Sequence, residues 1–206
     1  KEILLADGSV VHLNAHSSLT YPEKFEGDTR EVELTGEGFF DIAKDQAHPF
    51  TVHTPFEDVT VLGTSFNVRA YENEPNSEVS VSTGKVQVTS EESASSQILL
   101  PNEKAVVAHE GGIIDFEETE DLNESAWHTG VLTFSDATLN EVIQDLEGYY
   151  GVEFTLSNAE LGNCSYTSTF KKENLDTVLE AISTVLDIEF TKESEGHYMI
   201  DGGGCQ

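Results

Sequence analysis

The hydrophobic residues of this chain change their period about halfway along it, and this change constrains the fold more than any other feature. From residue 1 to about 116, apolar and polar residues alternate in short runs, as they do in strands with one buried face. Turn residues such as Asp7-Gly8, Gly63, Gly84 and Gly111-Gly112 separate the runs. The expected strands are residues 10–13, 31–34, 50–53, 59–62, 66–69, 79–81, 86–88 and 105–107. This part is therefore predicted to be all-β.

A loose repeat runs through the predicted strands. A glycine is followed within three residues by alternating apolar positions, and this happens after Gly8, Gly38, Gly63 and Gly84. The spacings of 30, 25 and 21 residues resemble the rungs of an irregular β-solenoid or roll. Since a β-sandwich produces a similar pattern, the residues leave the choice between these architectures open.

After residue 126 the period becomes helical. Leu139, Val142, Ile143, Leu146 and Tyr150 follow the spacing of an amphipathic helix with one apolar stripe. Asp136 or Thr138 can cap this helix, and Thr138 with Glu141 fits a capping box, while Gly148 and Gly151 lie where the helix should end.

The second part also repeats itself at an offset of 36 residues, so that Leu139 returns as Leu175 and Val142 as Val178. Each copy predicts strand, helix and strand, and residues 197–200 add one more strand. Two βαβ copies predict a small α+β sandwich with both helices on one face of the sheet. The whole chain is therefore expected to be α+β, with domains 1–122 and 123–206 meeting in an acidic linker, residues 117–126.

The net charge of −29 excludes several kinds of partner. Residues 1–122 hold 24 acidic and 7 basic residues, and residues 123–206 hold 15 and 3, so both parts are acidic. Nucleic acid and anionic membrane surfaces would be repelled by both. No run approaches the ~20 apolar residues of a membrane span, and the first residues do not form a signal peptide. We expect a piece of a longer protein that begins inside a domain.

The chain carries no recognisable catalytic, nucleotide-binding or metal-binding motif. Seven histidines are scattered, and His12 and His16 have a metal-ligand spacing only if they lie on a helix, whereas their surroundings predict strand and turn. We therefore expect no enzymatic activity, no cofactor and no metal. Cys164 and Cys205, the only cysteines, are candidates for one disulfide, which requires an oxidising compartment. They would meet if the strands 165–170 and 197–201 were antiparallel neighbours.

Several segments resemble successive signatures of the FecR family. In the first part these are residues 5–9 (Leu-Ala-Asp-Gly-Ser), 13–22, 30–42, 48–52 and 61–71, of which Leu62-Gly63-Thr64-Ser65-Phe66-Asn67-Val68 is the most specific. In the second part, Leu132, Phe134, Leu139, Val142 and Tyr149-Tyr150-Gly151-Val152 are similar to the domain at the C-terminus of these proteins, which is itself similar to the short N-terminal domain of secretins and TonB-dependent receptors. Ala6 and Gly38 depart from the usual proline and alanine.

The resemblance implies a signalling relay located in the periplasm. Such proteins cross the inner membrane once, hold an extracytoplasmic-function sigma factor on the cytoplasmic side and read an outer-membrane TonB-dependent transducer on the periplasmic side. This chain would be the sensing half, and it would reach the sigma factor through a segment that it does not contain. The residues expected to contact the transducer's signalling domain, along a free sheet edge and the adjacent helix, are Leu132, Phe134, Tyr149, Tyr150 and Phe154.

Two other readings of the residues stay open. A secretin- or receptor-type transport module would share the βαβ repeat but would not explain residues 1–116. A glycan-binding or glycan-cleaving β-solenoid would explain an extended β surface, and it predicts a groove with paired acids and exposed aromatic residues.

Overall fold

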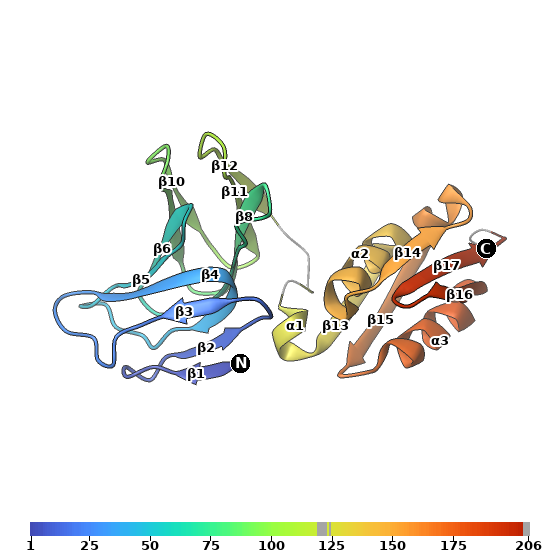
Figure 1. Ribbon diagram of the computed structural model, residues 1–206, viewed down its shortest axis with the longest axis horizontal. Helices are drawn as coiled ribbons and strands as arrows, with labels where there is room; N and C mark the ends of the chain where they lie inside the picture. The colour runs from blue at the N-terminus through green and yellow to red at the C-terminus, as the bar shows by residue number, and fades with distance from the viewer. Residues whose placement is uncertain (119–122, 124, 204–206) are drawn as a thin grey trace. The chain divides into compact units, whose positions relative to one another are not determined.

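The structure is a computed structural model that describes residues 1–118, 123 and 125–203. The chain divides into two compact units, Lys1–Glu124 and Ser125–Gln206, which we call the first and the second unit (Figure 1). The first unit is all-β and the second contains both helices and strands, so the fold is mostly β and α+β overall. Each unit has its own hydrophobic core.

The first unit contains all eight expected strands and four more, which are short or lie at its margins. They form a single sheet whose main path runs β10-β9-β6-β5-β4-β7-β8-β11-β12. The strands are β1 (Glu2–Leu4), β2 (Val10–Leu13), β3 (Ser18–Thr20), β4 (Arg30–Asp41), β5 (Phe50–His53), β6 (Glu57–Val61), β7 (Ser65–Ala70), β8 (Asn76–Thr83), β9 (Val86–Ser90), β10 (Ser96–Leu99), β11 (Glu103–Ala108) and β12 (Ile114–Glu118).

Strand β4 holds this sheet together because its two halves have different neighbours. Its first half pairs with β3 and β5, and its second half pairs with β2 and β7. The sheet thereby folds over a single core, which contains Val32 from the first half of β4, Phe40 from its second half and Phe66 from β7. The rings of Phe40 and Phe66 stack with their centroids 5.2 Å apart inside this core.

The glycine-led segments are not the rungs of a solenoid. Rungs of a solenoid would stack in parallel, whereas every strand pair of the first unit is antiparallel except β4 with β5. The repeat instead marks turns that lead into strands of a folded, nearly closed sheet. The solenoid form of the prediction is therefore wrong, because the spacing of turns does not determine which strands become neighbours.

Gly36 lies where β4 passes from one set of neighbours to the other. Its φ is +92°, and a Cβ atom at this position would lie 2.5 Å from Ser17 Oγ and 2.9 Å from Ser17 Cα. Only glycine combines that backbone angle with so close an approach.

Gly36→Ala is expected to lower the free energy of unfolding by about 3 kcal/mol or more, because backbone strain and a steric clash add. Gly27→Ala is the matched control, since Gly27 has a φ of +103° but nothing within 4 Å of its Cβ position. Urea unfolding followed by far-UV circular dichroism measures both variants. Equal losses in the two variants would show that the contact with Ser17 contributes nothing.

The second unit follows the 36-residue repeat closely. Its first copy comprises β13 (Val131–Thr138), α2 (Leu139–Tyr150) and β14 (Glu153–Leu156), and its second comprises β15 (Ser165–Lys171), α3 (Leu175–Leu186) and β16 (Ile188–Ser194). The short helix α1 (Ala126–Thr129) precedes them, η1 (Ala159–Asn163) joins the copies, and β17 (His197–Gly202) ends the unit. The predicted acidic linker overlaps β12 and α1 at its ends, and residues 119–122 and 124 lie outside the described residues.

The capping box predicted for α2 is present, and α3 has a side-chain cap as well. Thr138 and Glu141 form the capping box of α2, and Asn174 caps α3 by accepting a hydrogen bond from the Thr177 amide at 3.0 Å. Gly151 ends α2 in the left-handed conformation, whereas Gly148 lies within the helix.

The strands of the second unit form two small sheets and not the single sheet that was predicted. β13 pairs with β15, and β14, β17 and β16 form a second sheet in that order. One core joins both sheets and both helices, with Phe134 and Tyr166 from the first sheet, Ile200 from the second, and Val142 and Ile182 from the helices. Each copy of the repeat therefore contributes one strand to each sheet.

The sequence brings the two cysteines together if the strands 165–170 and 197–201 are antiparallel neighbours, and the structure does not pair these strands. β15 and β17 belong to different sheets, so they are not antiparallel neighbours. Cys164 is buried in the core of the second unit, just before β15, while Cys205 lies outside the described residues. Cys164 is nevertheless disulfide-bonded in the structure, and its pairing with Cys205 stays a prediction.

Non-reducing mass spectrometry of protein made under oxidising conditions is expected to find Cys164 and Cys205 in one linked peptide pair. In the chain-entropy model, closing a loop of this length contributes about 4 kcal/mol, so reduction should lower the unfolding temperature. Recovery of two thiols that react with an alkylating agent would contradict the pairing.

Candidate functional site

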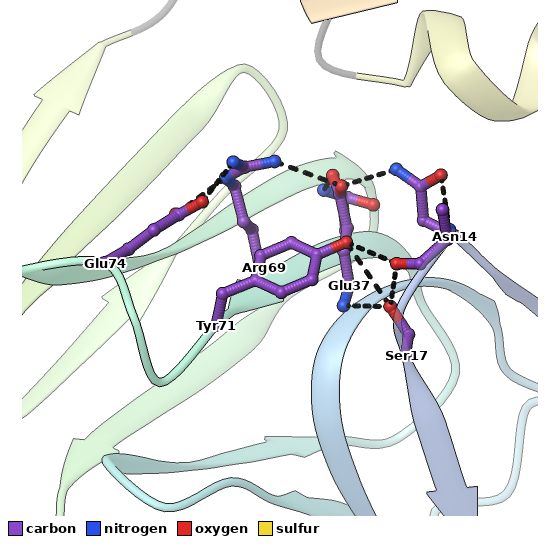
Figure 2. A network of polar contacts seen from close by, with 8 residues as sticks. Asn14, Ser17, Glu37, Arg69, Tyr71 and Glu74 are labelled. Carbon is purple, nitrogen blue, oxygen red and sulfur yellow. Dashed lines mark hydrogen bonds and ion pairs between the residues drawn. The ribbon is translucent and has the colours of Figure 1, made fainter. Parts of the chain in front are cut away.

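The signature segments of the first unit meet at a buried carboxylate. Glu37 of β4 is almost fully buried, and it accepts hydrogen bonds from Asn14 Nδ2 at 2.7 Å and Asn67 Nδ2 at 3.0 Å. Arg69 Nη1 lies 3.3 Å from Glu37 Oε2, and the same guanidinium binds Glu74 through Nε and Nη2 (Figure 2). The charge of Glu37 is thus compensated by a cation and two amides, as burial requires.

Tyr71 also belongs to this network, through contacts with Arg69 and with the loop after β2. The guanidinium of Arg69 lies over its ring at 5.0 Å, and the Tyr71 hydroxyl donates to the Ala15 carbonyl at 2.9 Å. Ser17 Oγ accepts a hydrogen bond from the Glu37 amide at 2.8 Å, so the loop after β2 is tied to β4 (Figure 2). Burial raises the pKa of Tyr71, which keeps its hydroxyl protonated as a donor.

A second ion pair, between a buried arginine and a partly buried acid, holds the start of β4. Arg30 is 3% exposed, its Nη1 lies 2.6 Å from Asp7 Oδ2, and it also donates to the carbonyls of Ala43 and His48. Burial acts to raise the pKa of Asp7, but hydrogen bonds from Ser9 and the charge of Arg30 lower it below its usual range. Both networks connect distant segments of one sheet, and their geometry is that of structural clamps.

One buried acid of the first unit, Glu57, forms no ion pair with a cation among the described residues. Glu57 of β6 is 0% exposed, and Ser77 Oγ of β8 donates to its Oε2 at 2.5 Å, while its Oε1 has no hydrogen-bond partner. Burial raises the pKa of Glu57 to about 7, with a smaller contribution from the charge of Asp58. Glu57 therefore titrates near neutral pH, and no motif of the sequence singles it out.

The structure corrects the predicted contact surface at two positions. Leu132 and Phe134 of β13 are each 2% exposed and belong to the core of the second unit. Phe134 packs against Tyr166 and Phe170 with ring centroids 6.0 and 6.4 Å apart. The two residues alternate with less buried neighbours, but their side of the strand is the inner one, so they support the fold and do not present a surface.

The other predicted residues are half-buried. Tyr149 and Tyr150 form an edge-to-face pair at 4.7 Å at the end of α2, and the Tyr150 hydroxyl donates to the Glu173 carbonyl at 2.8 Å. Burial raises the pKa of Tyr150 to about 12, helped by Tyr149 and Glu173. Phe154 lies against Phe190 and Tyr198 at 5.8 and 5.5 Å, so most of its ring serves the core.

Both edges of the three-stranded sheet carry features that oppose the addition of another strand. Glu147 of α2 accepts a hydrogen bond from the Phe154 amide at 2.8 Å, which occupies an outward-pointing donor of β14. β16 has a bulge between Lys192 and Ser194, and Lys192 lies over the ring of Tyr198 at 5.7 Å. The helices expose more apolar surface, since Val185 of α3 is 64% exposed. The apolar stripe predicted from the sequence did not indicate this exposed side chain.

The histidines do not assemble into a ligand set. His12 lies in β2 and His16 has a positive φ in the turn that follows, so the two do not share a helix. Among the residues that the structure describes, no group of three or more His, Cys, Asp or Glu side chains is placed to hold a metal ion. No helix within the described ranges is long and apolar enough to cross a membrane.

Comparisons with known proteins agree on the family. The family model described as FecR protein matches residues 1–87, and the one described as FecR, C-terminal, matches residues 131–200. Two crystal structures of a protein from Parabacteroides distasonis, described as a "putative anti-sigma factor", are 37% identical to this chain, with TM-scores of 0.69 and 0.68. The alignments cover 99% of this chain and 95% and 94% of those chains. No curated protein matches it. Because both units match in order and the likeness runs through nearly the whole sequence, the chain belongs to the FecR family.

Proposed function

We propose that this chain is the periplasmic sensor region of a FecR-like anti-sigma regulator. In this proposal it relays a signal, by protein–protein binding, from an outer-membrane TonB-dependent transducer to an extracytoplasmic-function sigma factor. The observation that carries the proposal is the pair of FecR matches, one in each unit and in family order. The similarity to a protein described as a putative anti-sigma factor supports the same role.

The second unit is the proposed receiver of the transducer's signalling domain. Its exposed apolar side chain Val185 and the half-buried pair Tyr149 and Tyr150 lie on helices, where a partner can cover them without displacing a strand. The guarded edges of β14 and β16 favour this helix side over addition of a strand to the three-stranded sheet. The proposed contact residues are therefore Tyr149, Tyr150 and Val185, and Phe154 supports them. Leu132 and Phe134 are buried and are no longer proposed to touch the partner.

Binding of purified transducer signalling domains to this chain, measured by calorimetry, tests the proposal. Val185→Lys is expected to weaken binding at least tenfold, because a charge would replace an apolar contact at the centre of the interface. Thr191→Lys is the matched control, since Thr191 is exposed on a strand of the same unit and the charge change is the same. We expect the control to bind like the parent chain.

Two results would overturn the proposal. If no signalling domain from a transducer encoded beside the regulator binds this chain, the proposed partner is wrong. If Val185→Lys and Thr191→Lys change the affinity equally, the proposed helix surface is wrong. Specific binding on a glycan array, with no binding of any signalling domain, would favour the glycan-binding alternative. A transport module is a weaker alternative, since the match to residues 1–87 is unexplained by it.

A further inference from the structure

The sheet of the first unit ends at β12, whose outer edge has no strand partner among the described residues. β12 is five residues long, and it pairs on one side only, with β11. The opposite end of the same path, β10, has four residues, and β1 and β3 have three each. In the second unit the edges of β14 and β16 are guarded, and β13 and β15 pair only with each other, across a bulge between Phe134 and Ala137. An edge of this length is a template for another strand, and the acidic side chains that it carries restrict which strands can pair with it.

The pairing of β11 with β12 shows which groups of β12 point away from the sheet. The Ala108 amide donates to the Ile113 carbonyl at 2.9 Å, which makes these two residues a hydrogen-bonded pair. In an antiparallel ladder such pairs alternate with non-bonded pairs, so the next residue of β12, Ile114, points its backbone groups outward. Phe116, two residues on, does the same. The amides of Ile114 and Phe116 are therefore the free donors of this edge.

The side chains of β12 alternate between apolar and acidic. Phe116 and Ile114 lie opposite the core residues Ala105 and Val107, on the inner face, and Phe116 is still 44% exposed there. Asp115 and Glu117 lie on the outer face and are exposed. Lys104 of β11 lies 3.7 Å from both Glu117 and Glu78, so two acids share this cation on one side.

We propose that the free edge of β12 binds an extended segment of a partner protein in which basic and apolar side chains alternate. The backbone of that segment would pair with the amides of Ile114 and Phe116. Its apolar side chains would cover Phe116 on the inner face, and its basic side chains would lie beside Asp115 and Glu117. A second copy of this chain is a poor occupant, because its net charge of −29 would repel the acidic edge.

This surface belongs to the first unit, so its test is independent of the transducer proposal. The probe is a synthetic peptide of about eight residues in which lysine and valine alternate, the period of a strand. A peptide of the same composition with the lysines and valines in two separate blocks is the control for charge alone. Affinity is measured by fluorescence anisotropy, and amide exchange is measured by NMR.

The alternating peptide is expected to bind more tightly than the block peptide and to slow exchange of the Ile114 and Phe116 amides. Asp115→Lys is expected to weaken binding roughly fivefold to tenfold at low salt, because a cross-strand attraction becomes a repulsion. Glu26→Lys is the matched control, since Glu26 is exposed on the loop before β4 and the change in net charge is identical. It should bind like the parent chain.

Equal binding of the two peptides, or equal losses in Asp115→Lys and Glu26→Lys, would show non-specific attraction and overturn the proposal. Protection of amides at another edge, with Ile114 and Phe116 unchanged, would overturn the location. The absence of any binding at low salt would overturn it entirely.

Discussion

Glu57→Gln is expected to raise the free energy of unfolding by about 2 kcal/mol above neutral pH and to lower it by about 1 kcal/mol in acid. Burial raises the pKa of Glu57 from 4.5 to about 7 in the folded chain. At a higher pH the folded chain must hold a buried charge, which costs about 3 kcal/mol for a difference of this size. Glutamine removes that cost, but its amide nitrogen would occupy the place of the unpartnered Oε1 and offset about 1 kcal/mol.

The direction of the pH dependence follows from the raised pKa. The protonated acid stabilises the folded chain fully below pH 4.5, and this contribution is lost as the pH rises through about 7. The two stability curves, measured by urea unfolding across this range, should therefore cross. Glu33→Gln, at an exposed position, controls for the loss of one acid. Parallel curves for Glu57→Gln and the parent chain would contradict the prediction.

Arg30→Leu is expected to lower the free energy of unfolding by about 3 kcal/mol, because it leaves the partly buried carboxylate of Asp7 without its cation. The carbonyls of Ala43 and His48 lose their donor as well. Arg30→Lys should lose less, since it keeps the charge but cannot reproduce the guanidinium fork.

A double-mutant cycle with Asp7→Asn measures the coupling in the Arg30 clamp. The double variant Asp7→Asn, Arg30→Leu should lose clearly less than the sum of the single variants, because each single change already breaks the pair. Far-UV circular dichroism during urea unfolding is the appropriate signal, since the only tryptophan, Trp127, lies in the second unit. Strictly additive losses would show that the 2.6 Å contact between Arg30 and Asp7 contributes nothing.

The features predicted correctly from the sequence are those that neighbouring residues decide. The stripe from Leu139 to Tyr150, with Thr138 and Glu141 before it and Gly151 after it, determines where α2 begins and ends. The repeat at 36 residues then places α3, although its cap is Asn174 and its end is Asp187 in the left-handed conformation. The alternation in residues 1–116 likewise predicted the strands, because a strand with one buried face has a period of two.

The residues of the contact surface could not be predicted from the local pattern alone. Alternation indicates that Leu132 and Phe134 share one side of a strand, but only the packing of the unit shows that this side faces the core. Val185 was not singled out by the sequence, and its exposure on α3 is evident only from the structure.

By itself the sequence determined that the chain has a β part and a duplicated βαβ part, that both are acidic, and that its signatures are those of the FecR family. Only the tertiary structure decided that β4 joins two groups of strands and that the βαβ copies divide their strands between two sheets. It also decided that Glu57 is a buried acid with no cation beside it in the described part of the chain. The physical reason is that periodicity and capping depend on residues a few positions apart. Strand pairing, burial and pKa depend on residues such as Asp7 and Arg30, or Glu57 and Ser77, that are distant in the chain and meet only after folding.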